Sequence, residues 1–577
     1  MSASTKHGSQ NASRLRVLSV VALLLMFVLL SKLYLLQVVH GAAYSEKADR
    51  QYLQPSNGVF DRGTIFFTAK DGTQVAAATI QSGFLLAISP KLITDKEGTY
   101  QALNAIQPLD QTEYATKTSN PNDTYEELAH HLTQDQATAI EKLSLPGVTL
   151  YKENWRVYPN GSLASHALGF IAHTGDSGDT VAGQYGLERY YEDVLSRTDD
   201  GTSKNFFAEI FSDLGASDSS DANKGDIVTT IEPTVQNYLE KAIAQTRATW
   251  KTDLTGGIII NPQNGEIYAM ALNPTFDPNT FNTEKNSGVF TDSLVEGVYE
   301  MGSIVKPLTL AAGLDSGVIT ASTTYDDTGF IELDGKKISN YDGKARGVIP
   351  MQQILNQSLN VGAAWVAKQM GNETMTKYFT AYGLGQETGI DLPHEAHGMI
   401  DNLQSPRMVE HATAAFGQGI AMTPIETARA LSVLGNGGKL INPHIVKSVT
   451  NLLGYTTVLS YGNEQQVLKP ETSRQITSML TTVVDKALKN GTVMLPHWSI
   501  AAKTGTAQIA NPAGGGYYTD RYLHSFFGYF PAENPKFLIF LYSVYPKGAE
   551  YASETLTDPF MDLAKFLIRY YEIPPDR

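Results

Sequence analysis

Tyr299-Glu-Met-Gly-Ser-Ile-Val-Lys-Pro307 is the segment around which this chain of 577 residues is organised. It places Ser303 and Lys306 three residues apart, so both side chains share one face if a helix begins near Ser303. A serine hydroxyl is a poor nucleophile without an adjacent base, and a lysine can be that base only if burial and nearby cations lower its pKa. By itself this S-x-x-K pair is a weak signal, because any exposed helix can carry it.

Two further motifs follow in chain order. Ser358-Leu-Asn360 is an S-x-N, and Lys503-Thr-Gly505 is a K-T-G. Taken alone, Ser358 would be interpreted as the cap of a helix. The three motifs in this order are typical of class A β-lactamases and penicillin-binding proteins. On these residues the chain resembles a class B penicillin-binding protein, which is a monofunctional peptidoglycan D,D-transpeptidase.

The resemblance implies a serine acyl-enzyme on stem peptides that end in D-Ala-D-Ala, with release of D-Ala and covalent inhibition by β-lactams. The catalytic residues it implies are Ser303, Lys306, Ser358, Asn360 and Lys503. The substrate-binding residues it implies are Thr504, Gly505 and Thr506. Gly505 would let the substrate backbone approach the strand closely. No metal or cofactor is expected.

The resemblance also assigns a role to each catalytic side chain. Ser303 would attack the penultimate D-Ala carbonyl after Lys306, held neutral near Lys503, has taken its proton. Ser358 would pass a proton to the departing D-Ala, and Asn360 would position Lys306 and the substrate amide. Which residue is the acylation base is left open, because it is disputed for related enzymes.

Two other functions are compatible with the same motifs. A β-lactam hydrolase or sensor shares them, but the chain shows no recognisable deacylating glutamate loop. A non-catalytic cell-wall scaffold is the second alternative, and the intact motifs argue against it. A bifunctional synthase is disfavoured because the segment before residue 225 shows no glycosyltransferase motif. A role in elongation and a role in division both remain open.

The N-terminus carries a candidate membrane anchor. Residues 17–39 are largely apolar and would span about 34 Å as a helix, enough to cross a bilayer. Lys6, Arg14 and Arg16 precede this segment, so the positive-inside rule places residues 1–16 in the cytoplasm and the rest of the chain outside. The alternative is a cleaved signal peptide, but the apolar segment is long for one. We expect a single-pass transmembrane helix.

Residues 40–224 are expected to form a non-catalytic pedestal of the dimerisation type. Patches that resemble this region of class B proteins are Asp61-Arg-Gly-Thr-Ile65, Arg156-Val-Tyr-Pro-Asn-Gly161 and Gly186-Leu-Glu188. We interpret them as turns and buried ion pairs. Glu126 and His130 are interpreted as part of a solvated helix face and not as a metal pair. The resemblance further implies a membrane partner, a SEDS-type glycosyltransferase that polymerises glycan strands.

Residues 225–577 are expected to form an α+β transpeptidase domain of the penicillin-binding and β-lactamase-like kind. The segment 257–272 has the pattern of a β-hairpin. Residues 501–508 are expected to form an edge strand, two further strands follow it, and a helix is expected at 559–571. The family fold implies an antiparallel sheet of five strands with helices on both sides.

Composition excludes several functions. The formal net charge of −15, with no compensating basic stripe, argues against nucleic-acid binding. The chain has no cysteine, which excludes disulfides, thiolate zinc sites and a lipid-modified cysteine anchor. An apolar content of 42% is typical of a globular chain.

Overall fold

The computed structural model describes residues 26, 61–174, 180–197, 224–462 and 464–577. Within these residues, no helix is both long and apolar enough to cross a bilayer. The predicted transmembrane segment 17–39 lies outside the described residues except for Met26, and so does the predicted cytoplasmic tail. The single-pass topology therefore stays a prediction.

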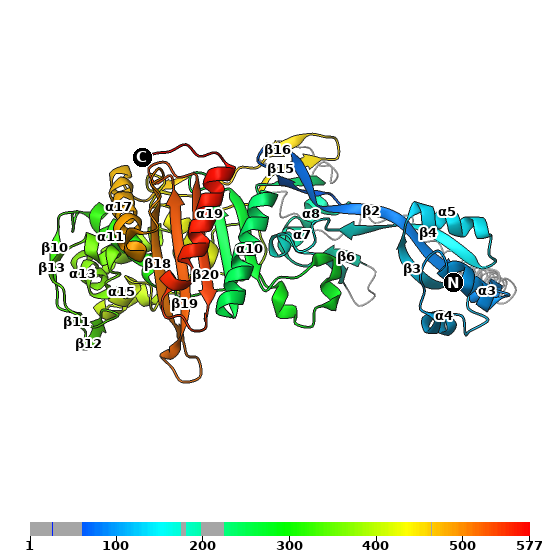
Figure 1. The fold of residues 1–577 in the computed structure, drawn as a ribbon, viewed down its shortest axis with the longest axis horizontal. Helices are drawn as coiled ribbons and strands as arrows, with labels where there is room; N and C mark the ends of the chain where they lie inside the picture. The colour runs from blue at the N-terminus through cyan, green and yellow to red at the C-terminus, as the bar shows by residue number, and fades with distance from the viewer. Residues whose placement is uncertain (1–25, 27–60, 175–179, 198–223, 463) are drawn as a thin grey trace, which may run out of the picture. The chain divides into compact units, whose positions relative to one another are not determined.

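The described chain forms two compact units (Figure 1). The smaller unit contains Gln81–Trp155. The larger unit combines Arg62–Ile80 with Arg156–Arg577. The segments that flank the smaller unit in sequence therefore pack with the C-terminal part of the chain. The predicted domain boundary between residues 224 and 225 stays a prediction.

The smaller unit is a small sheet with three helices. Its strands are the second part of β2 (Gln74–Ile88), β3 (Glu126–Leu132) and β4 (Val148–Val157). Its helices are α3 (Lys96–Asn104), α4 (Gln111–Lys117) and α5 (Gln134–Leu143). Apolar side chains from each kind of element, among them Leu86, Leu103 and Ile140, form its core.

The helix expected around Glu126 and His130 is wrong, because these residues lie in strand β3. Pairing with β2 outweighs the local sequence, which carries no strong strand pattern. His130 Nδ1 lies 2.9 Å from a carboxylate oxygen of Glu153, so the histidine has a protein partner. Among the described residues, no group of three side chains is arranged to hold a metal ion.

The larger unit is built on the expected five-stranded antiparallel sheet, which confirms the α+β prediction. Its strand order is β18 (Ala501–Ala510), β19 (Tyr517–Phe530), β20 (Phe537–Val544), β8 (Leu254–Ile260) and β9 (Ile267–Asn273). The hairpin expected at 257–272 is the β8–β9 pair. Strand β18 is the edge strand, as expected, and along one of its sides no strand of the described residues pairs with it.

Helices cover both faces of this sheet (Figure 1). Helices α10 (Pro233–Trp250) and α19 (Thr557–Tyr570) lie on one face, where Leu239 and Leu563 pack against Ile259 and Phe526. The opposite face packs against the turn Gly302–Val305, α16 (Pro424–Ser432) and α17 (Pro470–Thr482). Helices α11 (Lys306–Ser316) and α13 (Asn360–Met370) belong to the same apolar core. This two-sided burial explains why β8, β9 and β20 are apolar along almost their whole length.

A second sheet of the larger unit joins distant parts of the sequence. Strand β1 (Ile65–Thr68) pairs with the start of β2 and with β7 (Gly225–Thr229). Strand β7 then pairs with β15 (Val446–Asn451), and β15 pairs with β16 (Thr456–Val458).

The remaining elements of the larger unit are short. The helices are α6 (Ser165–Leu168), α7 (Gly186–Tyr190), α8 (Glu192–Leu195), α12 (Gln352–Asn356), α14 (Asn372–Ala381), α15 (Met408–Ala414), α16 (Pro424–Ser432) and α18 (Ala552–Thr555). The strands are β5 (Ile171–Thr174), β6 (Thr180–Gly183), β10 (Thr324–Asp327), β11 (Phe330–Leu333), β12 (Lys336–Ser339), β13 (Gly347–Pro350), β14 (Lys439–Leu440) and β17 (Gln465–Gln466).

A buried ion network organises the segment before β7. Arg62 Nε donates to Glu188 at 2.6 Å, and Arg156 Nε donates to the other carboxylate oxygen of Glu188 at 2.7 Å. Arg62 also bonds to Glu192 at 2.8 Å, and Arg156 donates to the carbonyl of Gly63 at 2.7 Å. These contacts confirm the interpretation of the Arg62, Arg156 and Glu188 patches as buried ion pairs.

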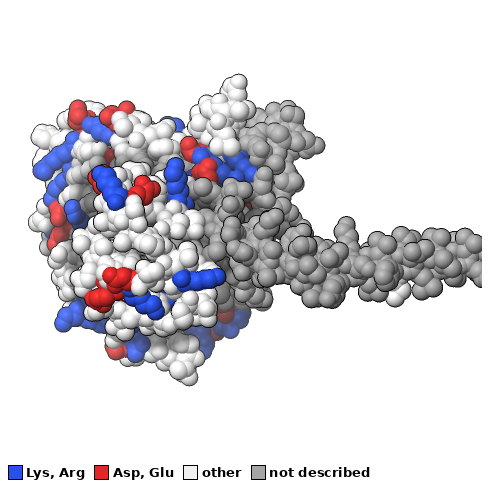
Figure 2. Space-filling model, turned by 90° about the vertical axis from the view of Figure 1, so that its right-hand side faces the viewer, with Lys and Arg blue, Asp and Glu red and all other residues white. Residues whose placement is uncertain are grey.

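The surface charges are mixed. On the face drawn in Figure 2, the Lys and Arg side chains of the described residues are interspersed with Asp and Glu. This face therefore presents no continuous basic stripe among those residues.

Candidate active site

Ser303 lies in a tight turn at the start of α11. The turn Gly302–Val305 is a 3-10 helix, and α11 continues it from Lys306 with Pro307 in its first turn. Gly302 has a φ of 63°, and an added Cβ would meet the carbonyl oxygen of Thr506 at 2.7 Å. Only glycine therefore lets this turn approach β18 so closely.

Lys306 is completely buried behind Ser303. Its Nζ atom lies 2.9 Å from Ser303 Oγ, 2.6 Å from the carbonyl oxygen of Ser358 and 3.2 Å from Ser358 Oγ. Burial, together with the nearby charge of Lys503, lowers the pKa of Lys306 well below the usual lysine range. A neutral amine can accept a proton from the serine hydroxyl, so this arrangement suits an activated serine nucleophile.

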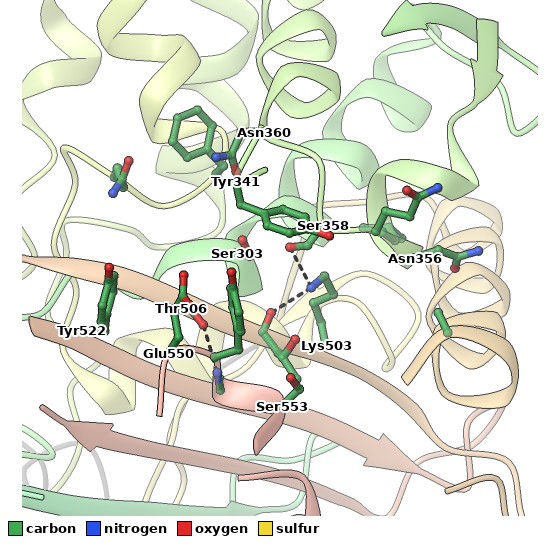
Figure 3. A pocket seen from close by; sticks show the side chains of 18 of the residues that line it. Ser303, Tyr341, Asn356, Ser358, Asn360, Lys503, Thr506, Tyr522, Glu550 and Ser553 are labelled. Atoms are coloured by element: carbon green, nitrogen blue, oxygen red, sulfur yellow. Dashed lines mark hydrogen bonds between the residues drawn. The ribbon is translucent and has the colours of Figure 1, made fainter. Parts of the chain in front are cut away.

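Ser358 contacts both lysines and does not cap a helix. It has a φ of 54°, in the left-handed region, and lies between α12 and α13. The residue that caps α13 is Leu359, whose side chain makes no capping bond. Lys503 Nζ donates to Ser358 Oγ at 3.1 Å (Figure 3). The strained backbone thus directs the hydroxyl between Lys306 and Lys503.

Asn360 makes a different contact from the one expected. Its side-chain amide donates to the carbonyl of Ser339 at 3.3 Å, whereas the expectation was a contact with Lys306. Ser339 ends strand β12, so Asn360 joins that strand to the start of α13. Asn360 still lines the cleft beside Ser303.

Strand β18 forms the other wall of the site. Burial lowers the pKa of Lys503 to about 7. The alternation of the strand turns Thr504 and Thr506 toward the cleft, and Thr506 Oγ1 accepts a bond from the Ala552 N–H at 3.1 Å. Gly505 faces the opposite way, where an added Cβ would meet Ser525 Oγ at 2.3 Å.

The absence of a side chain at Gly505 therefore allows close packing of neighbouring segments of this chain against β18. The same Cβ would lie 2.7 Å from the carbonyl oxygen of Met301, in the chain segment that carries Ser303. Whether Gly505 also brings a substrate backbone close stays a prediction.

These residues meet at one cleft of about 760 Å³ (Figure 3). Of the predicted residues, those that line it are Ser303, Ser358, Asn360, Lys503, Thr504 and Thr506. Lys306 and Gly505 are buried behind its surface. The structure therefore brings together three motifs that are far apart in sequence.

Sequence reasoning missed several other residues of this cleft. Tyr341 and Tyr551 come from separate loops, and their ring centroids lie 6.1 Å apart. Asn356, Leu488 and Lys489 also line the cleft. Of these residues, only Asn356 could have been predicted from the sequence, because it stands two residues before Ser358. The others belong to no motif, so no sequence pattern marks them.

Family models match most of the chain. Residues 255–563 match the model described as "Penicillin binding protein transpeptidase domain". Residues 61–227 match the model described as "Penicillin-binding Protein dimerisation domain".

Curated relatives match over most of their length. "Stage V sporulation protein D" of Bacillus subtilis is 29% identical over 511 residues, which cover 87% of this chain and 77% of the relative. "Peptidoglycan D,D-transpeptidase FtsI" of Escherichia coli strain K12 is 25% identical and covers 99% of this chain and 94% of the relative.

Solved structures share the fold. Penicillin Binding Protein 2X from Streptococcus thermophilus has a TM-score of 0.72 at 20% identity, over 89% of this chain and 81% of that one. Penicillin binding protein 3 of the tuberculosis mycobacterium, complexed with aztreonam, has a TM-score of 0.68 at 21% identity, over 90% of this chain and 98% of that one.

Proposed function

The chain belongs to the penicillin-binding protein transpeptidase family and is a peptidoglycan D,D-transpeptidase, and we propose that Ser303 forms its acyl-enzyme. The family assignment confirms the resemblance to class B penicillin-binding proteins. One observation carries the proposal for Ser303. Its hydroxyl lies 2.9 Å from the buried amine of Lys306, whose pKa is lowered by burial and by Lys503.

Acylation begins with proton transfer within this turn. Lys306 accepts the proton of Ser303, and the alkoxide attacks the penultimate D-Ala carbonyl of a stem peptide. The N–H groups of Ser303 and Thr506 stabilise the developing oxyanion, each contributing roughly 3 kcal/mol by analogy with measured donors. Lys503, Thr504 and Thr506 bind the terminal carboxylate of the substrate.

Departure of D-Ala needs a proton on its nitrogen. Ser358 supplies this proton, because its hydroxyl lies within hydrogen-bond distance of both Lys306 and Lys503. The contact of Asn360 with Ser339 supports a positioning role: it fixes the start of α13 while the amide faces the cleft. An amine from a second stem peptide then resolves the ester into a cross-link.

Labelling with penicillin tests the assignment of Ser303. Mass spectrometry of the penicillin-treated protein should find one adduct, on the peptide that contains Ser303. Ser303→Ala should abolish the adduct and keep the melting temperature within a few degrees, because the hydroxyl is small and partly exposed to the cleft. An adduct on another serine would overturn the assignment.

We further propose that residues 17–39 anchor the chain in the membrane beside a glycan polymerase of the SEDS type. The support is the apolar length of the segment, the basic residues before it and the family assignment. Small and polar positions such as Ser19, Ala22 and Ser31 suit helix–helix packing in a bilayer. Replacing residues 17–39 with an unrelated spanning helix tests this pairing: co-purification with the polymerase should fall, and unchanged co-purification and growth would show that the anchor carries no partner specificity.

A further inference from the structure

The cleft extends to both sides of Ser303. Figure 3 shows Thr506 and Tyr522 on one side, and Lys503, Ser358 and Asn356 on the other. The register of the sheet agrees, because Tyr522 pairs with Gln508, further along β18 from Lys503. Helix α12, which ends at Asn356, contacts the turn Val483–Ala487, and Leu488 and Lys489 follow that turn directly. We call the side with Thr506, Gln508 and Tyr522 the donor half, and the side with Asn356, Leu488 and Lys489 the far half.

The position of Ser358 decides which group enters the far half. Its hydroxyl, bonded to both lysines, lies between Ser303 and Asn356 in this view. The leaving amine must receive its proton on that side. By microscopic reversibility, the acceptor amine must arrive on the same side, because it gives up its proton to the same groups.

We propose that the far half of the cleft is the binding site for the acceptor stem peptide, with Asn356, Leu488 and Lys489 as its contacts. This inference rests on the proposed acyl-enzyme at Ser303 and adds the location of the second substrate. The acceptor is a peptide that presents a free amine to the ester and carries at least one carboxylate.

The wall of the far half has an unusual backbone. A π-helical turn, Val483–Ala487, follows α17 and leads into the kinked turn Leu488–Gly491. Within it, Lys489 and Asn490 are consecutive non-glycine residues in the left-handed region, with φ of 45° and 55°. Such turns and strained residues concentrate at functional sites, because the surrounding fold must hold them in place.

The charge of Lys489 suits an acceptor carboxylate. Its Nζ atom bonds to Asp558 at 2.6 Å, but both side chains are substantially exposed. An exposed pair of this kind contributes little stability, so the ammonium can exchange Asp558 for a carboxylate of the incoming peptide. Asn356 accepts a bond from Gln352 at 2.8 Å, which orients its amide at the edge of the far half.

The chemical step is an aminolysis of the ester. The amine nitrogen forms a bond to the acyl carbon, the bond between that carbon and Ser303 Oγ breaks, and the amine proton returns through Ser358 and Lys306 to Ser303. Water in place of the amine gives hydrolysis. The ratio of aminolysis to hydrolysis, here called the partition, therefore measures how well the acceptor binds. The acylation rate measures how well the donor half binds the first substrate.

The experiment measures that partition on the full-length chain in detergent. The donor is a thioester of an acyl-D-alanine, and the acceptors are stem tripeptides whose side-chain amine belongs to lysine or to diaminopimelate. We expect Asn356→Ala and Lys489→Asn to lower the ratio of aminolysis to hydrolysis about three- to tenfold, as for one lost hydrogen bond or ionic contact. Asparagine tolerates the left-handed backbone of position 489.

Two matched variants serve as controls. Gln508→Ala, in the donor half, should change acylation by the thioester and leave the partition unaltered. Asp558→Asn removes the partner of Lys489 outside the cleft and should leave the partition equal to or above that of the unmodified chain.

Each outcome has one meaning. An unchanged partition in both far-half variants, with normal acylation by penicillin, overturns the acceptor site and leaves Ser303 as the nucleophile. An equal loss in Asp558→Asn also overturns it, because the ion pair alone would then explain the effect. Absence of acylation in the unmodified chain would overturn the proposed acyl-enzyme, and the acceptor site with it.

Discussion

The Nζ atom of Lys306 lies 2.9 Å from the Oγ atom of Ser303, and both residues belong to one continuous turn of chain. Lys306 is fully buried, so its pKa is lowered by desolvation and further by the charge of Lys503. The proposed nucleophile and its proposed proton acceptor are therefore fixed by the same local backbone. This geometry makes the base assignment, which the sequence left open, testable with a single substitution.

Lys306→Met should slow acylation by penicillin about 10²- to 10⁴-fold, the usual contribution of a general base. Methionine is unbranched and neutral, so it fills the buried site without an uncompensated charge, and the variant should remain folded. The second-order rate constant for acylation, measured beside a thermal unfolding curve, checks both expectations. Normal acylation in a folded variant would mean that another group is the base.

Lys503 gives a second prediction, on pH dependence. Burial lowers its pKa to about 7, so the free enzyme loses this cation as the pH rises through about 7. If Lys503 binds the carboxylate of penicillin, the second-order acylation rate constant should fall above that pH. Lys503→Arg keeps its charge at this pH, so its acylation rate constant should not fall as the pH rises above about 7. An equal fall of the rate constant in the arginine variant would show that another group titrates.

The three motifs predicted the polar side chains that surround Ser303, because each motif places its own residues close together along the chain. Ser303 and Lys306 are neighbours within one turn, and Lys503 lies on the predicted edge strand. What the motifs could not predict is the direction of side chains fixed by distant packing. The contact of Asn360 with Ser339 and the packing of Gly505 against Met301 depend on elements remote in sequence.

The fold was predictable where the hydrophobic pattern is strong and failed where it is weak. The apolar runs of β8, β9 and β20 predicted these three strands, whereas the five-stranded sheet that contains them was implied by the family resemblance. The stretch around Glu126 and His130 is polar and short, and its strand conformation comes from pairing with β2. Apart from Asn356, the far half of the cleft had no signal in the sequence, because its turn at Lys489 is defined by backbone strain and not by residue type.

Asp292→Asn is predicted to stabilise the protein at alkaline pH. Burial raises the pKa of Asp292 to about 7, and one of its carboxylate oxygens has no hydrogen-bond partner among the described residues. Between pH 3.8 and about 7 the unfolded chain ionises this group while the folded chain does not, so the free energy of unfolding falls as the pH rises.

Asparagine at position 292 stays neutral, so the free energy of unfolding of this variant should not fall as the pH rises from 4 to 8. Its advantage over the unmodified chain should reach about 1–4 kcal/mol at pH 8 and disappear near pH 4. Denaturant unfolding at both pH values measures it. A difference that does not change with pH would contradict ionisation as its cause.

The last prediction concerns the ion network of Arg62, Glu188 and Arg156. Glu188 is completely buried between the two arginines. Burial opposes its charge, but Arg156 and Arg62 lower the pKa of Glu188 below its usual value overall. Because the folded-state pKa is depressed, this stabilisation is present above the ordinary glutamate pKa of 4.5 and is lost as the pH falls below it.

Glu188→Gln should lower the free energy of unfolding at pH 7 by about 3–5 kcal/mol, because it leaves two buried guanidinium groups without their shared counter-charge. Glu192→Gln is the matched control, since Glu192 bonds Arg62 from a side chain that is 26% exposed and should cost less. The difference between the two variants should shrink as the pH falls below 4.5, because the Glu188 carboxylate then protonates in the unfolded chain while the folded chain keeps it ionised. Denaturant midpoints of the three proteins at pH 7 and pH 4 measure this, and equal losses in both variants would show that the buried charge of Glu188 does not organise the segment.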